Sequence, residues 1–76
     1  MLAVQCKMAR AALGLGVREV AEAAKVSPDT VVRLERGEAL KERTVDAIRT
    51  ALEAAGVEFI PENGGGAGVR LRKRPS

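Results

Sequence analysis

Apolar residues recur at the spacing of helix faces up to position 56, and they predict a helix at each end of this stretch. The first helix has an apolar stripe whose members are four, three and four residues apart: Leu2, Cys6, Ala9 and Leu13. It ends at 14–16, a Gly-Leu-Gly run. A later helix extends from about Glu42 to Ala55, and its stripe comprises Val45, Ile48, Leu52 and Ala55. Gly56 ends it, because glycine readily adopts the left-handed conformation that closes a helix.

Residues 17–37 predict two further short helices joined by a tight turn. Apolar residues repeat at helical spacing as far as Ala24, and the repeat resumes after the turn at Val31 and Leu34. Ala21 is small at the point where the second helix would have to cross the first closely. This is the layout of a helix-turn-helix, whose second helix is short enough to enter the major groove of DNA.

The second helix of this pair has well-marked ends. Ser27 is expected to cap it by accepting a hydrogen bond from the amide of position 29 or 30. Pro28 falls at the first helical position, where a missing N–H costs nothing. Asp29 follows in the first turn, where the helix dipole favours negative charge. Gly37 marks the end, as a residue free to adopt positive φ.

This segment resembles the Cro/phage-repressor type of helix-turn-helix, the XRE family, over about residues 5–55. The residues that carry the resemblance are Ala21, Val26-Ser27, Thr30-Val31 and the run Arg33-Leu34-Glu35-Arg36-Gly37. Lys25 stands where the family usually has glycine, so it either takes a left-handed conformation, at about 1 kcal/mol, or shifts the turn. Gly16 stands at a helix start where the family often has Ser or Thr, and Glu19 supplies half of a capping box there.

After Gly56 the pattern changes to the alternation typical of strands, in Val57-Glu58-Phe59 and again in Val69-Arg70-Leu71-Arg72. The connection, 61–68, is rich in turn residues, so we expect a β-hairpin. One face of it carries the apolar residues Val57, Phe59, Val69 and Leu71. Because a lone two-stranded hairpin is barely stable in water, we expect this face to mediate dimerisation. The alternative is that the hairpin packs on the fourth helix of the same chain.

Together these patterns predict a mainly α fold: a four-helix Cro/repressor-like helix-turn-helix domain followed by a C-terminal β-hairpin. We expect residues 1–56 to form the helix-turn-helix DNA-binding domain, 57–72 the dimerisation hairpin and 73–76 a basic tail. The tail either contacts DNA phosphates or extends into solvent.

The resemblance places base contacts on the exposed face of the second helix of the pair, at Pro28, Asp29, Val32 and Arg33. Arg33 can donate two hydrogen bonds to guanine O6 and N7, and Val32 can pack on a thymine methyl group. Asp29 can accept a hydrogen bond from cytosine N4, or serve only as an anion at the helix start. Pro28 has no donor and contributes shape alone.

Phosphate contacts are expected from two groups of residues around this helix pair. Within the pair the candidates are the amide of Val17 and the side chains of Arg18, Ser27 and Thr30. After it they are Arg36, Lys41 and Arg43. For each Lys or Arg the alternative is an ordinary solvated surface charge.

Glu35 needs a different interpretation, because an acid beside a DNA groove is unfavourable unless it is paired. Members of the resembled family often pair an arginine of the first helix with the acid of the Arg-Leu-Glu-Arg-Gly run. The resemblance therefore implies a structural ion pair between Arg10 and Glu35 rather than a DNA contact.

Composition narrows the class of protein further. The net charge of +3 suits a polyanionic partner. Cys6, the only cysteine, lies in an apolar stripe, which favours a small core residue over a reactive thiol. No apolar segment is long enough to span a membrane, so a cytoplasmic location is expected. With no histidine and no carboxylates clustered beside a base, the sequence predicts no enzyme, cofactor, metal site or small-molecule ligand.

We therefore expect a sequence-specific transcriptional regulator, a repressor, that binds double-stranded DNA in the major groove. A chain of 76 residues buries a marginal core, which favours a homodimer. Twofold symmetry would place two recognition helices about 34 Å apart on a palindromic operator. The alternative is an antitoxin-like or anti-activator protein that uses the same fold mainly to bind another protein.

Overall fold

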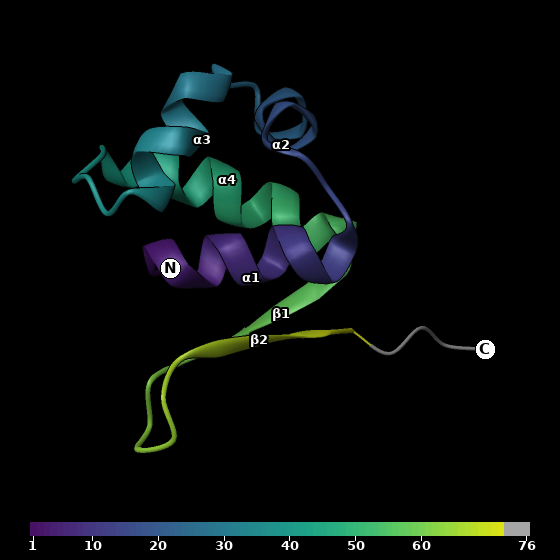
Figure 1. Cartoon of the computed structure of the whole chain (residues 1–76), viewed down its shortest axis with the longest axis vertical. Coiled ribbons are helices and arrows are strands. Elements are labelled where there is room, and N and C mark those ends of the chain that lie inside the picture. Colours follow the sequence, from purple (N-terminus) through teal and green to yellow (C-terminus); the bar gives the residue numbers. More distant parts are fainter. Residues whose placement is uncertain (73–76) are drawn as a thin grey trace.

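Residues 1–72, the part of the chain that this computed structural model describes, form four helices and one two-stranded antiparallel hairpin (Figure 1). In chain order the elements are α1 (Ala3–Leu13), α2 (Val17–Ala24), α3 (Pro28–Glu35), α4 (Glu42–Ala55), β1 (Val57–Ile60) and β2 (Gly68–Leu71). The predicted fold class, a mainly α domain followed by a C-terminal hairpin, is confirmed. The expected basic tail, 73–76, lies outside the described residues.

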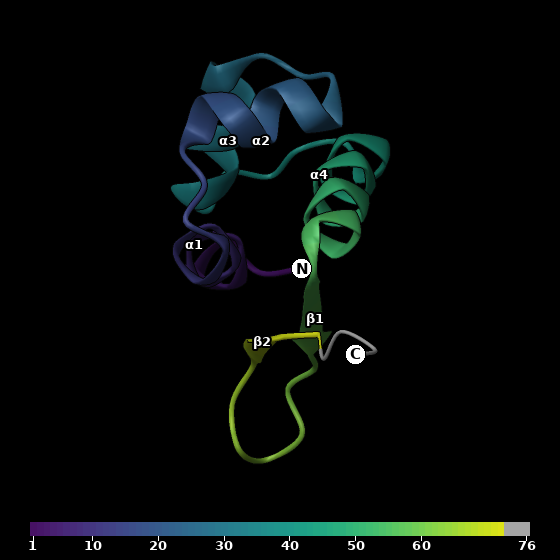
Figure 2. The same ribbon diagram turned by 90° about the vertical axis from the view of Figure 1, so that its right-hand side faces the viewer.

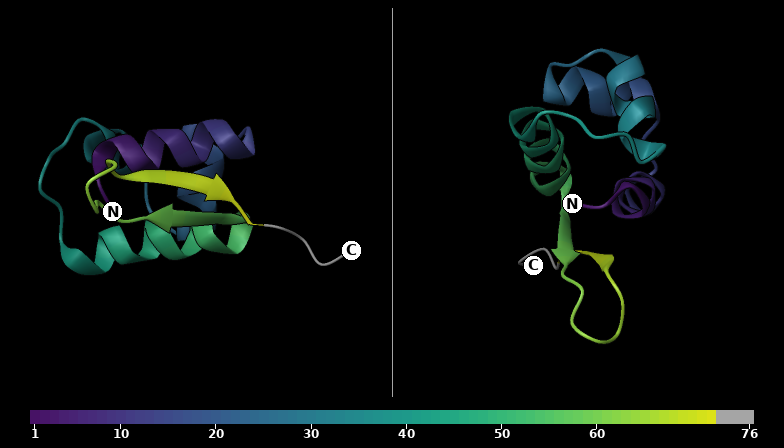
Figure 3. Two further views of the ribbon diagram at one scale, coloured as in Figure 1. Left: turned by 90° about the horizontal axis from the view of Figure 1, so that it is seen from below. Right: turned by 90° about the vertical axis from the view of Figure 1, so that its left-hand side faces the viewer.

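The elements form three tiers along the molecule. Helices α1 and α4 lie side by side in the middle, with α2 and α3 at one end and the hairpin at the other (Figure 2). Viewed from the hairpin end, β2 runs beneath α1 and β1 beneath α4 (Figure 3). None of the helices within residues 1–72 is both long enough and apolar enough to cross a membrane.

The core is packed from small and branched aliphatic side chains, as a chain with a single aromatic residue requires. Its buried members are Cys6, Ala9, Val20, Ala21, Ala24, Val31, Leu34, Ile48, Leu52 and Val57. Of the other residues in the predicted stripes, Leu13 and Val45 are partly buried and pack against this core, whereas two are exposed. Leu2 is 52% exposed because it is the N-cap of α1 rather than part of its first turn. Ala55 is exposed in the last turn of α4.

The hairpin packs on its own chain, which is the alternative to dimerisation that the sequence left open. The register pairs Val57 with Leu71 and Phe59 with Val69, so the four apolar residues do share a face. That face points at the helices: Val57 is fully buried in the core, and Phe59 and Val69 pack against it. Val57 is therefore unavailable to a second copy, whereas Leu71 remains 57% exposed.

Two side chains from the helices hold the hairpin in place. Gln5 of α1 is 4% exposed, and its Nε2 donates to the carbonyl oxygens of Ile60 at 3.0 Å and Gly68 at 3.1 Å. These two carbonyls belong to the last pair of the ladder, so one amide group joins both strands to α1. From α4, the Arg49 guanidinium lies 5.5 Å from the centroid of the Phe59 ring.

Candidate nucleic-acid interface

The turn between α2 and α3 depends on an unusual backbone conformation at Lys25. Its φ of 59° and ψ of 44° are left-handed, and it is the one non-glycine residue with positive φ within residues 1–72. This conformation lets the amides of Lys25 and Val26 donate to the carbonyls of Glu22 at 3.2 Å and Ala21 at 2.9 Å. The last turn of α2 is closed in this way, and the turn keeps its geometry at the cost of strain at Lys25.

Side-chain caps fix the starts of both helices of the pair. The Ser27 Oγ accepts a hydrogen bond from the Thr30 amide at 3.2 Å and lies 2.8 Å from the Thr30 hydroxyl, while Pro28 occupies the first turn of α3. At the start of α2, the Gly16 amide donates to Glu19 Oε1 at 2.8 Å.

The end of α3 is closed by a glycine turn that reverses the chain. Gly37 has a φ of 89°, its amide donates to the Leu34 carbonyl at 3.0 Å, and the Glu38 amide donates to the Arg33 carbonyl at 3.1 Å. This pair of bonds is the Schellman pattern, which needs a residue able to adopt positive φ at position 37. The turn brings Glu38 back alongside α3.

Helix α3 presents one face to the core and the opposite face to solvent. Val31 is fully buried and Leu34 is 5% exposed, so the inner face is anchored. The four predicted base-contacting residues lie on the other side: Pro28, Asp29 and Arg33 are exposed, and Val32 is half-buried. This short helix therefore offers a solvent-facing row of side chains on a rigidly held backbone.

The predicted phosphate-contacting residues divide into two groups in the structure. Ser27, Thr30 and Lys41 line a surface hollow of about 410 Å³ together with Arg33. Its remaining walls are Val26, Ala39, Leu40 and Thr44, so the α3–α4 connection and the first turn of α4 flank α3. The other candidates lie outside the hollow: Val17 and Arg18 in the first turn of α2, Arg36 at the end of α3, and Arg43 in α4.

One residue of this region, Glu38, was not singled out from the sequence. Its Oε1 lies 3.1 Å from Arg33 Nε and its Oε2 lies 3.7 Å from Arg36 Nη1. The signal that could have identified it is the glycine at 37, because a Schellman turn places the residue after the glycine beside the last turn of the helix. The acid thus sits between two arginines near the candidate DNA-facing surface.

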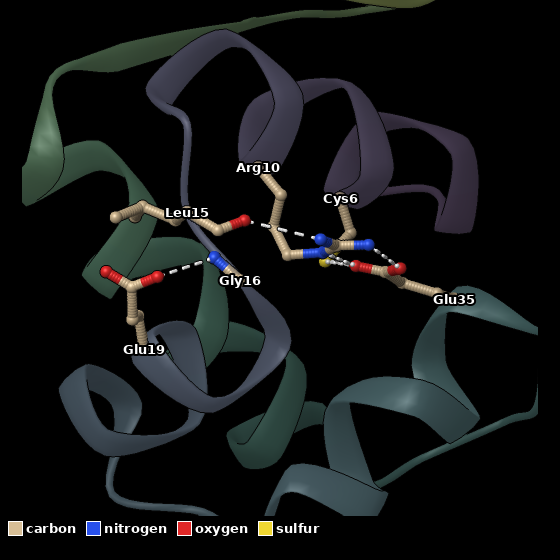
Figure 4. A network of polar contacts seen from close by, with 6 residues as sticks. All are labelled: Cys6, Arg10, Leu15, Gly16, Glu19 and Glu35. Carbon is tan, nitrogen blue, oxygen red and sulfur yellow. Dashed lines mark hydrogen bonds and ion pairs between the residues drawn. The ribbon is translucent and has the colours of Figure 1, made fainter.

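A buried polar network ties α3 to α1 (Figure 4). Arg10 donates from Nε to Glu35 Oε2 at 2.7 Å and from Nη2 to Glu35 Oε1 at 2.8 Å, which is a bidentate pair. Glu35 is 8% exposed and the Arg10 side chain 25%. Arg10 also reaches the Leu15 carbonyl through Nη1 at 3.3 Å, so the same guanidinium fixes the α1–α2 connection.

Cys6 completes this network. Its thiol donates to Glu35 Oε2 at 3.3 Å, and burial, reinforced by the hydrogen bond to the Glu35 carboxylate, raises the pKa of the thiol to about 12. The hydrogen bond from Arg10 holds the pKa of Glu35 below its ordinary value, although burial opposes it. Glu35 is therefore a paired anion facing α1, and Cys6 is a protonated core residue without thiolate chemistry. Within residues 1–72 no group of three or more His, Cys, Asp or Glu side chains is placed to hold a metal ion.

Comparison with known protein families gives a match over the helical part of the chain. A family model described as a helix-turn-helix domain matches residues 2–59, which cover all four helices and the start of the hairpin. No curated protein matches the chain.

Proposed function

The chain belongs to the helix-turn-helix domain family, and from that premise we propose that it is a sequence-specific transcriptional regulator, a repressor, that binds DNA in the cytoplasm. The observation that carries this proposal is the division of α3 into two faces. Its inner face is anchored by Val31 and Leu34, while its outer face is open to solvent and ends in an arginine. A short helix held in this way can enter a major groove without losing core contacts.

On this proposal the outer face of α3 reads the bases. Arg33 donates to guanine O6 and N7, and Val32 packs on a thymine methyl group. Asp29 accepts from cytosine N4, and Pro28 restricts shape. The flanking groups bind phosphates and set the position of the helix in the groove: the Val17 amide, Arg18, Ser27, Thr30, Arg36, Lys41 and Arg43.

The free edge of β2 supports a homodimer, with a smaller apolar contact than the sequence predicts. Pairs in an antiparallel ladder alternate between bonded and non-bonded. The Arg72 amide donates to the Gly56 carbonyl at 2.7 Å, so these two residues form a bonded pair. The pairs Val57–Leu71 and Phe59–Val69 are therefore non-bonded, and the backbone N–H and C=O groups of Val69 and Leu71 point away from β1. Two such edges, related by a twofold axis, would extend the hairpins into a four-stranded sheet.

Neighbouring side chains favour this edge over other surfaces. Val4 and Met8 on α1, the helix that packs on β2, are 47% and 36% exposed, and Leu71 is 57% exposed. Glu58 lies 2.7 Å from Arg70, which offsets the repulsion between two copies of β2. A dimer of this kind would present two α3 helices to a palindromic operator with half-sites about 34 Å apart.

Exposed apolar residues at the start of α1 support a second candidate function. Leu2 and Val4 are 52% and 47% exposed on or beside α1, outside the hollow that Arg33 lines, and offer an apolar surface to a different protein. An antitoxin-like or anti-activator protein would use this surface as its main site of action. The two functions differ in whether the chain alone selects a DNA sequence.

Selection of bound sites from random duplex DNA tests the proposal directly. The full chain should enrich a palindromic site without any partner. Arg33→Ala should then weaken binding to the enriched site by about 1–3 kcal/mol and relax preference at one base pair per half-site. Arg43→Ala is the matched control, because losing a phosphate contact should weaken binding to all sequences alike.

Two results would count against the proposal. If no sequence is enriched at low salt, the chain is not a sequence-specific regulator on its own. If Arg33→Ala weakens binding to selected and random duplexes equally, Arg33 contacts phosphate and the assigned base readout is wrong.

A further inference from the structure

Glu38 makes two kinds of contact with the same arginine. Its backbone amide donates to the Arg33 carbonyl at 3.1 Å, and its carboxylate lies 3.1 Å from Arg33 Nε. Arg33 is the one predicted base-contacting residue with an ion pair among residues 1–72. The backbone hydrogen bond and the Gly37 turn fix the position of the Glu38 backbone, and the carboxylate is thereby held beside Arg33.

The atoms that Glu38 leaves free are the ones that guanine needs. A guanidinium has five N–H donors in a planar fork. With Nε occupied by the carboxylate, the donors of Nη1 and Nη2 remain available for the acceptor pair O6 and N7. Because a long side chain loses rotamer freedom when it is fixed on a partner, an arginine already held at Nε loses less on binding.

The negative charge of Glu38 also favours sequence-specific binding over non-specific binding. A carboxylate close to the DNA surface repels phosphates and so reduces binding that is independent of sequence. It also lies 3.7 Å from Arg36 Nη1, so it offsets the charge of a second cation that would otherwise attract any duplex. Both members of the Arg33–Glu38 pair are well exposed, at 46% and 41%, so the pair adds little to folding.

From these contacts we infer that Glu38 is a specificity-determining positioning residue, which holds Arg33 in the orientation used to read a guanine. The inference rests on the proposed function, because it assigns Glu38 a role within DNA recognition. Glu38 itself need not contact a base. The alternative is that Arg33 and Glu38 form an ordinary surface ion pair that has no effect on DNA recognition, and the tests below distinguish the two.

A binding comparison across two backgrounds tests the role in recognition. Glu38→Gln removes the charge while keeping the side-chain length, and Glu42→Gln makes the same charge change at another exposed acid. Affinity is measured for the selected duplex, for that duplex changed at the base pair assigned to Arg33, and for random duplex DNA. All three proteins are then compared with their Arg33→Ala counterparts.

Glu38→Gln should lower the ratio of selected to changed-site affinity by about threefold to tenfold, as expected for one side chain that must now be immobilised on binding. Glu42→Gln should leave that ratio unchanged. In the Arg33→Ala background, Glu38→Gln should have no effect on the ratio. A ratio that is unchanged, or that falls equally with and without Arg33, would overturn the inference.

A measurement without DNA separates failure of the inference from failure of the proposed function. Nitrogen-15 relaxation of the arginine Nε–H groups should show Arg33 more ordered than Arg18, which has no ion pair within residues 1–72. This difference should shrink in Glu38→Gln, whose neutral amide oxygen is a weaker acceptor than the carboxylate. Equal mobility of the two groups in the parent protein would overturn the inference. An ordered Arg33 in a protein that selects no DNA sequence would instead overturn the proposed function, and the recognition role of Glu38 with it.

Discussion

Three side chains decide how firmly the recognition helix is held. Arg10 and Cys6 both donate to Glu35, and the contacts lie between α1 and α3, away from the solvent-exposed face of α3. A buried carboxylate is tolerated only when its oxygens are bonded, and here both oxygens are. The orientation of α3 therefore depends on residues that need not touch DNA.

Removing Arg10 should affect stability more than sequence preference. Arg10→Ala leaves the Glu35 carboxylate, 8% exposed, without its bidentate partner, and we expect a loss of about 3 kcal/mol in the free energy of unfolding. Denaturant titration and thermal melting measure the loss, and Arg43→Ala, an exposed residue of α4, is the control. A variant that melts like the parent but no longer binds DNA would show that Arg10 is itself a DNA contact.

The same pair makes stability depend on acidic pH. The pKa of Glu35 is lower in the folded chain than its ordinary value of 4.5, chiefly because Arg10 donates to it. The unfolded chain thus takes up a proton first, so the stabilisation is complete above pH 4.5 and is lost as the pH falls towards the folded pKa.

Comparison of Glu35→Gln with the parent measures this contribution. The parent should lose stability below pH 4.5 more steeply than the variant, by up to about 1.4 kcal/mol per pH unit. Urea titrations at several pH values give the two slopes, and Glu22→Gln, an exposed acid of α2, should keep the parent slope. Equal slopes for parent and Glu35→Gln would mean that the ion pair contributes no pH dependence.

Helix boundaries followed from the sequence because local chemistry determines them. Ser27, Pro28 and Gly37 act on backbone groups within a few residues of themselves, so their roles need no knowledge of the rest of the chain. The Arg10–Glu35 pair came only from the resemblance to the XRE family, since twenty-five positions separate the two residues. Nothing local indicated that Gln5 would bond strand carbonyls more than fifty positions away.

The hairpin shows where pattern reasoning ends. Alternation predicted its strands, and the register placed its apolar residues on one face. Which surface that face would meet depended on the path of the whole chain, and Gly56 directs β1 straight back beneath α4. The alternation was compatible with both interpretations, and the structure buries Val57 against the helices of its own chain.

Relieving the strain at Lys25 should stabilise the α2–α3 turn. Lys25→Gly removes the Cβ that disfavours a φ of 59°, and after the entropy that glycine adds to the unfolded chain we expect a gain of about 0.5–1 kcal/mol. For a domain of this size that is a rise of roughly 2–8 °C in Tm. Lys25→Ala removes the charge but keeps the Cβ, so it should give no such gain. A stabilised alanine variant would attribute the effect to charge instead of strain.

Helix α1 connects the two ends of the molecule. Gln5 bonds both strands of the hairpin, and Arg10, five positions later, bonds α3 at the opposite end. A dimer formed through β2 would therefore hold its two recognition helices at a spacing set by α1. Deleting 57–76 is a poor test of dimerisation, because the deletion also destabilises the fold. It removes Val57 from the core and leaves Gln5 without its hydrogen-bond partners.

A single substitution on the β2 edge separates dimerisation from folding. Leu71 is 57% exposed, so Leu71→Glu should change the free energy of unfolding by no more than about 0.5 kcal/mol. In the proposed dimer, however, both acids would lie in the apolar contact between the two β2 edges. We expect sedimentation at micromolar concentration to give a monomer, and binding to the selected palindrome to weaken roughly 100-fold because the second half-site no longer binds on the same molecule. Asn63→Glu adds the same charge in the hairpin loop and should leave both properties unchanged. If Leu71→Glu sediments as a dimer, the interface lies on another surface, and the exposed Leu2 becomes the next place to test.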